Sequence, residues 1–155
     1  MHRNVGNQVN GSDLNVLSCL EFAVTVLNVK HIIVAGHYDC GAVISAGKKQ
    51  DLGLLENWIR PIRDVYRTHQ STMSLVKDPV IRHRTFVELN VVEQCLNVYK
   101  TGVVQRKRME AAKKGETPYP KIHAMVFDPK VGILNKIPVN FKKTVDQYRD
   151  IYDLY

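Results

Sequence analysis

Residues 31–43 read HIIVAGHYDCGAV, and this stretch decides the fold of the chain. Three consecutive β-branched residues, at 32–34, predict a strand buried on both faces of a parallel sheet. Gly36 ends the apolar run, and a helical pattern begins near Cys40, so the stretch has a strand–turn–helix form. Ligand sites of open α/β sheets lie beyond the carboxyl ends of such strands. The residues after Gly36 are therefore candidates for a functional site.

His37 and Cys40 stand three residues apart in this turn, and imidazole and thiolate are both good zinc ligands. The same residues allow a second interpretation, in which His37 caps the helix and Cys40 is a small buried apolar residue. Asp39 lies between them and is a weaker candidate ligand, because its spacing turns it away from the metal. The pattern alone leaves zinc binding and ordinary packing open.

Length and composition suit one compact domain, residues 1–155, of which 45% are hydrophobic. No apolar run approaches the roughly 18 residues of a membrane span, and His2-Arg3-Asn4 does not open a signal peptide. Three cysteines are too few for a disulfide framework in a domain of this size. We therefore expect an intracellular protein with no membrane association, in the cytoplasm or alternatively in an organelle.

The net charge of +7 is concentrated in residues 106–115, RKRMEAAKKG. This segment has no interleaved aromatic residues and no nucleic-acid motif. We interpret it as a solvated helix face that concentrates small anions near the protein, and we expect no nucleic-acid partner.

Periodicity along the chain predicts an α/β fold in which helices flank a small, mostly parallel β-sheet. We expect helices at 12–29, 40–46, 80–99 and 142–152, a basic helix ending at Lys114, strands at 31–36 and 121–127, and an edge strand within 132–139. Residues 51–70 have a helical period, but Pro61 should kink or break that helix.

Four segments in series resemble those of the β-class carbonic anhydrases: HRNVGNQV at 2–9, HIIVAGHYDCGAV at 31–43, DLGLLENWIRPIRDVY at 51–66 and ELNVVEQ at 88–94. The resemblance implies a β-carbonic anhydrase-like fold and reversible hydration of carbon dioxide to bicarbonate at a Zn²⁺ ion. It also implies a homodimer or a larger homo-oligomer.

Carried over to this chain, the resemblance makes His37 and Cys40 two of the three zinc ligands. It assigns substrate binding to the backbone N–H of Gly41 and to Arg3, whose counterpart binds bicarbonate at a regulatory site in some members. Ala42 stands where many members have a second glycine. Phe127 stands where a hydroxyl-bearing aromatic residue often assists the regulatory site, so the resemblance does not support regulation by bicarbonate here.

The family's strand with Cys-x-Asp-x-Arg is missing from this sequence, which opens at Met1-His2-Arg3-Asn4. In the family that strand precedes the HRN segment and provides the third zinc ligand, a thiolate, and an Asp–Arg pair, so the catalytic residues remain unassigned. Cys19 and Cys95 do not replace the ligand, because both lie in amphipathic helical patterns where apolar packing is the usual role.

The missing strand is the first central strand of the family's sheet, and its loss leaves backbone groups without partners. We expect a longer protein, a strand from a second chain, or direct pairing of the HRN segment with residues 31–36. For the chain as it stands we expect weak or no carbon dioxide hydration. The alternative is a catalytically inactive relative or fragment that acts as a structural or interaction partner.

Overall fold

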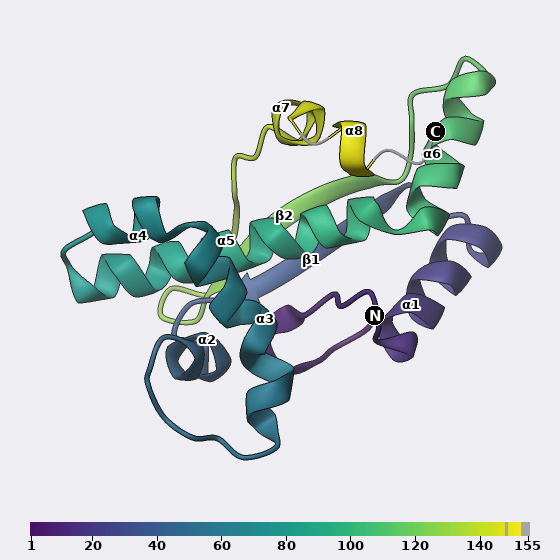
Figure 1. Ribbon diagram of the computed structural model, residues 1–155. Helices are drawn as coiled ribbons and strands as arrows, with labels where there is room; N and C mark the ends of the chain where they lie inside the picture. Colours follow the sequence, from purple (N-terminus) through teal and green to yellow (C-terminus); the bar gives the residue numbers. More distant parts are fainter. Residues whose placement is uncertain (148, 153–155) are drawn as a thin grey trace.

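The computed structural model describes residues 1–147 and 149–152. Its elements are η1 (Val5–Asn7), α1 (Leu14–Glu21), η2 (Phe22–Val26), β1 (His31–His37), α2 (Gly41–Ala46), α3 (Leu55–Thr68), α4 (Gln70–Leu75), α5 (Pro79–Lys100), α6 (Gly102–Lys113), β2 (Lys121–Asp128), β3 (Ile133–Lys136), α7 (Phe141–Asp146) and α8 (Arg149–Tyr152). The expected α/β class is confirmed, with a small sheet and flanking helices (Figure 1).

The three strands lie in the order β1-β2-β3. β1 and β2 are parallel and in register from His31 opposite Lys121 to His37 opposite Phe127, whereas β3 returns antiparallel to β2. The sheet is therefore mixed. Residues 1–4 form no strand, so one of the three alternatives, direct pairing of the HRN segment with β1, is wrong. The described residues leave the outer edge of β1 without a partner strand.

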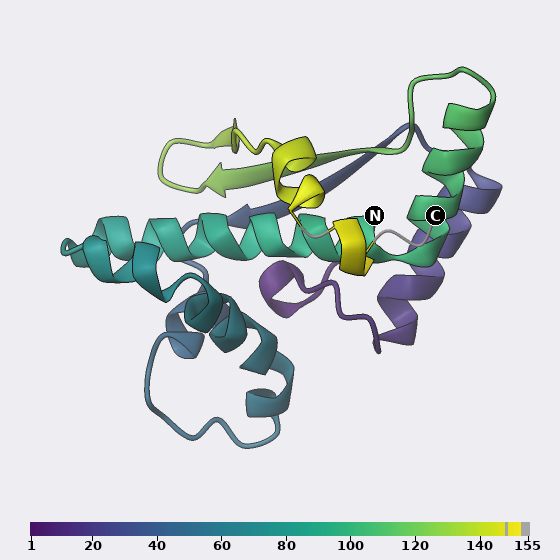
Figure 2. The ribbon, with the colours of Figure 1, turned by 45° about the horizontal axis from the view of Figure 1, so that its top comes forward.

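Helix α5 covers one face of the sheet and contributes Phe86, Val87, Val91, Cys95 and Val98 to the core beneath it (Figure 2). Val34 of β1 and Val126 of β2 point to this face and are buried. At Gly36 the helix comes so near that a Cβ would lie 2.6 Å from Cγ2 of Val91. Because only glycine leaves room for this contact, Gly36 sets the distance between α5 and β1.

The opposite face of the sheet is open, so the expectation that β1 is buried on both faces is wrong. Ile33 is 55% exposed, Phe127 40% and Leu134 51%, and Ala35 is exposed between them. We call Ile33, Ala35, Phe127 and Leu134 the open sheet face. In Figure 2 the long helix α5 lies along the other face of the two parallel strands.

Two predicted helices differ in detail from the structure. Residues 12–29 form α1 followed by the π-helical turn η2, and residues 142–152 form the shorter helices α7 and α8. Helix α3 runs unbroken through Pro61, because a buried face containing Ile59, Ile62 and Val65 offsets the local cost of proline, about 3 kcal/mol. In the described part of the chain, no helix has the length and apolar character needed to cross a membrane.

Buried amides of α5 hold the N-terminal segment against the sheet. The Gln94 Oε1 atom accepts a hydrogen bond of 2.8 Å from the backbone N–H of Val9, and the Asn90 side-chain amide donates to the carbonyl of Gly6 at 3.1 Å. Both side chains are fully buried or nearly so. These bonds satisfy the backbone of a segment that has no strand partner of its own.

A substitution at Gly36 tests whether the contact between α5 and β1 controls stability. We expect Gly36→Ala to lower the free energy of unfolding by about 1–3 kcal/mol, because the new methyl group overlaps Val91. Urea unfolding followed by circular dichroism measures the change. Gly11→Ala is the matched control, since nothing lies within 4 Å of its added Cβ. Equal stability of the two variants would contradict the proposed packing constraint.

Candidate functional site

His37 is the last residue of β1, and its side chain is exposed at the carboxyl end of the parallel strands. The backbone N–H of the next residue, Tyr38, donates to the carbonyl of Phe127 on β2 at 2.9 Å. This bond continues the ladder between β1 and β2 by one residue. The turn that carries the candidate ligands therefore starts from a fixed edge of the sheet, at the carboxyl end of β1, as the sequence predicts.

The imidazole of His37 has a defined orientation. Its Nδ1 atom lies 2.8 Å from the backbone carbonyl oxygen of Tyr38. A carbonyl oxygen can only accept a hydrogen bond, so Nδ1 must carry the proton. In the neutral imidazole Nε2 then keeps its lone pair. A histidine that binds a metal through Nε2 is usually held in this way, with the other ring nitrogen donating to a backbone carbonyl or carboxylate.

Cys40 follows at the N-cap of α2 and is buried, with 5% of its surface exposed and no disulfide partner. Between the two candidate ligands, Asp39 adopts a left-handed backbone conformation with φ +56°. This conformation costs a non-glycine residue about 1–2 kcal/mol. Its half-exposed carboxylate lies 3.8 Å from the Lys130 ammonium group, so Asp39 forms a loose ion pair with a lysine.

The described residues contain no group of three or more His, Cys, Asp or Glu side chains that could hold a metal ion. Catalytic zinc ordinarily has three protein ligands. His37 and Cys40 therefore fit a zinc site only in part. Cys95 is fully buried in α5, where burial raises the pKa of its thiol to about 12, and Cys19 lies in α1. Neither cysteine lies in the turn after β1.

The two predicted substrate-binding residues lie on different segments. Gly41 is the first residue of α2, and its N–H belongs to the first turn, where helix geometry leaves N–H groups without an acceptor in the helix. Arg3 is exposed on the N-terminal segment, and the described residues give it no hydrogen bond or ion pair. That segment reaches the end of β1 through Asn7, whose Oδ1 would lie 3.2 Å from a Cβ at Gly36.

Sequence reasoning missed a polar network that surrounds Tyr38. The Tyr38 hydroxyl donates a hydrogen bond of 2.5 Å to Oε1 of Glu88 on α5. The guanidinium of Arg84, one turn earlier, lies 4.2 Å from the centre of the Tyr38 ring and donates to Asp128 at the end of β2, at 3.0 Å. Burial, then the bond to Glu88, raise the pKa of Tyr38 to about 12, so its phenol remains a neutral donor.

His83 on α5 is a second residue that the sequence did not indicate. Its Nε2 atom is buried and has no hydrogen-bond partner in the described structure. Burial lowers the pKa of His83, Asp39 opposes that shift, and His37 adds to it. Because His83 interacts electrostatically with both Asp39 and His37, it lies near the turn after β1. The spacing of Arg84 and Glu88 on one face of α5 was the available signal for this side of the site.

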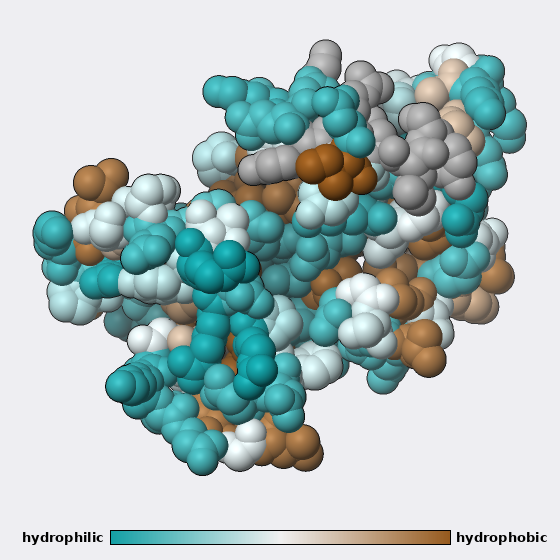
Figure 3. Space-filling view, in the orientation of Figure 1, coloured by the Kyte–Doolittle hydropathy of each residue, from teal (hydrophilic) through white to brown (hydrophobic). Residues whose placement is uncertain are grey.

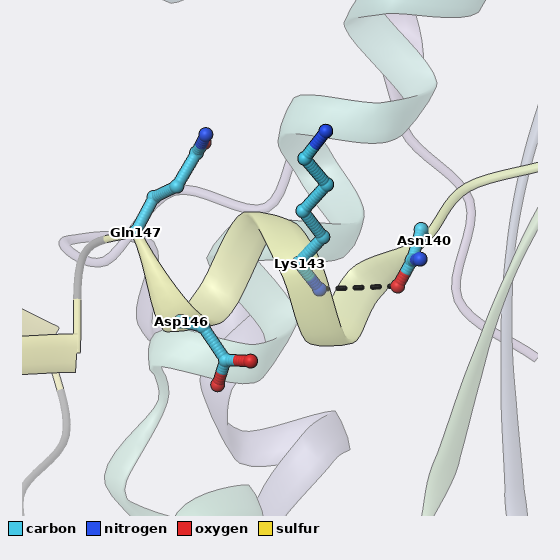
Figure 4. Close-up of a pocket in the computed structure, with 4 residues that line it drawn as sticks. All are labelled: Asn140, Lys143, Asp146 and Gln147. Atoms are coloured by element: carbon cyan, nitrogen blue, oxygen red, sulfur yellow. Dashed lines mark hydrogen bonds between the residues drawn. The ribbon is translucent and has the colours of Figure 1, made fainter.

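Two hollows of the surface lie away from the turn after β1. Figure 4 shows one of about 410 Å³, lined by Asn140, Lys143, Asp146 and Gln147. There the Asn140 Oδ1 atom accepts from the backbone N–H of Lys143 at 3.0 Å, so it caps α7. A second hollow, of about 580 Å³, contains the His69–Glu93 pair between α5 and the C-terminal helices. Neither hollow is lined by His37 or Cys40.

Comparison with known proteins identifies the family. The model of the carbonic anhydrase family matches residues 1–134. The chain is 41% identical to a carbonic anhydrase of Emericella nidulans over 154 residues, which cover 99% of this chain and 65% of that protein. It is 30% identical to a carbonic anhydrase of Candida albicans over all of this chain and 52% of that protein. The chain thus spans between half and two thirds of these relatives.

Solved structures agree with the sequence relatives. The β-carbonic anhydrase CafA of Aspergillus fumigatus superposes with a TM-score of 0.82 at 25% identity, covering 99% of this chain and 71% of that one. A Coccomyxa β-carbonic anhydrase in complex with acetazolamide superposes with a TM-score of 0.78 at 31% sequence identity, covering 94% of this chain and 64% of that one. A tetrameric β-carbonic anhydrase of Sordaria macrospora superposes with a TM-score of 0.77 at 27% sequence identity, covering 89% of this chain and 67% of that one. From its sequence and its fold, this chain belongs to the β-class carbonic anhydrases.

Proposed function

We propose that this chain provides part of the active site of a zinc-dependent enzyme that reversibly hydrates carbon dioxide to bicarbonate. The observation that carries the proposal is the orientation of His37 at the end of β1, with Nδ1–H donating to the Tyr38 carbonyl and the lone pair of Nε2 left for a metal. His37 Nε2 and Cys40 Sγ would be two ligands of the metal. Family membership supports this chemistry.

A zinc ion bound in this family's manner would lower the pKa of a water molecule, so that hydroxide forms near neutral pH. The residues of this chain would then bind and orient the substrate. The N–H of Gly41, at the start of α2, is a donor for an oxygen of carbon dioxide or bicarbonate. The exposed guanidinium of Arg3 is a cation available to bicarbonate.

The donor set limits what the chain does alone. With two ligands, the described residues would hold a metal less firmly than the usual three would. We therefore propose weak or no hydration by the isolated chain, and activity where another segment or polypeptide provides the third donor. The competing proposal is a catalytically inactive relative or fragment that acts as a structural partner, and the lack of a three-donor group in the described residues favours it.

We further propose an intracellular location, in the cytoplasm or alternatively in an organelle. Cys19, Cys40 and Cys95 are all free thiols, as expected of a protein in a reducing compartment. Small anions and carbon dioxide are the proposed small-molecule partners. The open sheet face supports a further partner, a second copy of this chain, because an apolar sheet face exposed in a monomer favours association.

Zinc titration against a chromophoric chelator tests the ligands. We expect His37→Ala and Cys40→Ser each to weaken zinc binding more than about tenfold, since even the loss of an outer-shell partner costs 10–100-fold. His31→Ala is the matched control, because His31 is at the opposite end of the same strand, and we expect no change. Equal binding by all three variants would exclude His37 and Cys40 as ligands.

Stopped-flow hydration with a pH indicator then separates the two proposed functions. We expect the isolated chain to accelerate hydration little. If a polypeptide that contributes a third donor is added, the enzyme proposal predicts zinc-dependent hydration that is lost in Cys40→Ser. The structural-partner proposal predicts no hydration under either condition. Full hydration activity in the isolated chain would show that two ligands suffice and would overturn the proposed limit.

Sedimentation velocity tests the proposed homo-oligomer. We expect Ile33→Lys to shift the protein towards the monomer, because burying an unpaired ammonium group in an apolar contact is unfavourable. Leu54→Lys is the control, since Leu54 is 87% exposed and lies before α3, away from the sheet. An unchanged mass in Ile33→Lys would exclude the open sheet face as the interface, and a monomeric wild type would exclude the homo-oligomer.

A further inference from the structure

We propose that Tyr38 is a positioning residue, held by Glu88 and by the Arg84–Asp128 pair, that fixes the His37 imidazole in the Nδ1–H tautomer. The inference rests on the proposed role of His37 as a metal ligand through Nε2, and it names the residues that prepare that ligand. The contacts that carry it join three elements: the end of β1, the end of β2 and the first half of α5.

The first step is the acceptor for His37. Its Nδ1 proton is directed to the carbonyl of Tyr38, so the direction of that carbonyl decides which ring nitrogen is protonated. The preceding peptide, between His37 and Tyr38, is itself fixed, because the Tyr38 N–H donates to the carbonyl of Phe127 at 2.9 Å. Rotation of the Tyr38 carbonyl away from the imidazole would free His37 to adopt either tautomer.

The second step is what keeps the Tyr38 carbonyl in place. The next residue, Asp39, is in the left-handed region with φ +56°, and its one ion pair among the described residues, to Lys130, is 3.8 Å long and solvent-exposed. Such a turn persists when its surroundings fix it. Tyr38 provides that restraint, because its side chain is 8% exposed and its hydroxyl is bound to Glu88 at 2.5 Å.

The third step is how rigidly the restraint itself is held. Arg84 and Glu88 lie one turn apart on α5, so the two side chains project from the same helix face. Glu88 accepts from the Tyr38 hydroxyl, while the Arg84 guanidinium lies over its ring and donates to Asp128. Asp128 is 6% exposed and also accepts from the backbone N–H of Lys130. The ring of Tyr38 is therefore fixed at its edge and at its face.

The test measures the tautomer directly and without metal, by two-bond ¹H–¹⁵N correlation spectra of the imidazoles in the whole chain. We expect His37 of the wild type to be protonated at Nδ1. In Tyr38→Phe and in Glu88→Ala the ratio of the Nδ1–H to the Nε2–H form should fall about fivefold, the factor for one hydrogen bond. Glu88→Gln keeps an acceptor oxygen and should restore the wild-type ratio.

Tyr66→Phe is the matched control. Like Tyr38, Tyr66 has a hydroxyl that is hydrogen-bonded to a side chain of α5, in this case as the acceptor from Arg82. Its ring packs on Phe86, and it takes no part in the network around Tyr38. We expect its His37 spectrum to match the wild type. Glu88→Ala leaves Tyr38 itself unchanged and removes only its hydrogen-bond acceptor, so this variant serves as the test if Tyr38→Phe fails to fold. An unchanged His37 tautomer in either folded variant would overturn the inference.

Zinc binding separates this inference from the proposed function. If the wild type binds zinc, Tyr38→Phe should weaken binding about tenfold, as loss of an outer-shell partner does, and Tyr66→Phe should not. If the wild type binds no zinc while the tautomer still depends on Tyr38, the positioning role stands and the proposed metal site fails. Zinc binding that is equal in the wild type and Tyr38→Phe would overturn the positioning role and leave the metal site intact.

Discussion

The close contact of α5 with β1 at Gly36 is the constraint on which the rest of the structure depends. Because Val91 occupies the space that a side chain at this position would fill, the helix lies directly against the strand. The side chains of α5 are thereby held at a fixed distance from the carboxyl end of the sheet. Asn90 and Gln94 bind the N-terminal segment on one side, and Arg84 and Glu88 hold the turn after β1 on the other.

This arrangement explains why the turn after β1 is well defined although it is short and partly exposed. Three of its groups are bound in different directions: the Tyr38 N–H to β2, the Tyr38 hydroxyl to α5 and the His37 ring to the Tyr38 carbonyl of the turn itself. Hydrogen bonds that converge from separate rigid elements leave few alternative conformations, so they orient a side chain better than an equal number within one loop.

Much of the fold could be predicted because its signals are local. Strand β1, helix α5 and strand β2 follow from β-branched runs and helical spacing, and the structure confirms them to within two residues. The position of His37 at a strand end follows from the same pattern. The open face of β1 could not be predicted, since the burial of Ile33 depends on which layers pack on the sheet and the strand pattern contains no information on that. The bonds of Tyr38 and Arg84 join residues 50 and 44 positions apart, beyond the reach of any local periodicity.

The orientation of His37 and the supply of metal donors are two separate properties of this chain. Orientation of His37 is complete within the chain, since every group that fixes the Tyr38 carbonyl belongs to β1, β2 or α5. The described residues contain no group of three His, Cys, Asp or Glu side chains that could hold a metal, so under the proposed function another segment or polypeptide would provide the third ligand. Asp39, between the two, has a left-handed backbone conformation that glycine adopts at less cost. Under the proposed function, the network around Tyr38 would hold the His37 imidazole in place before a metal binds, because preorganisation lowers the cost of binding.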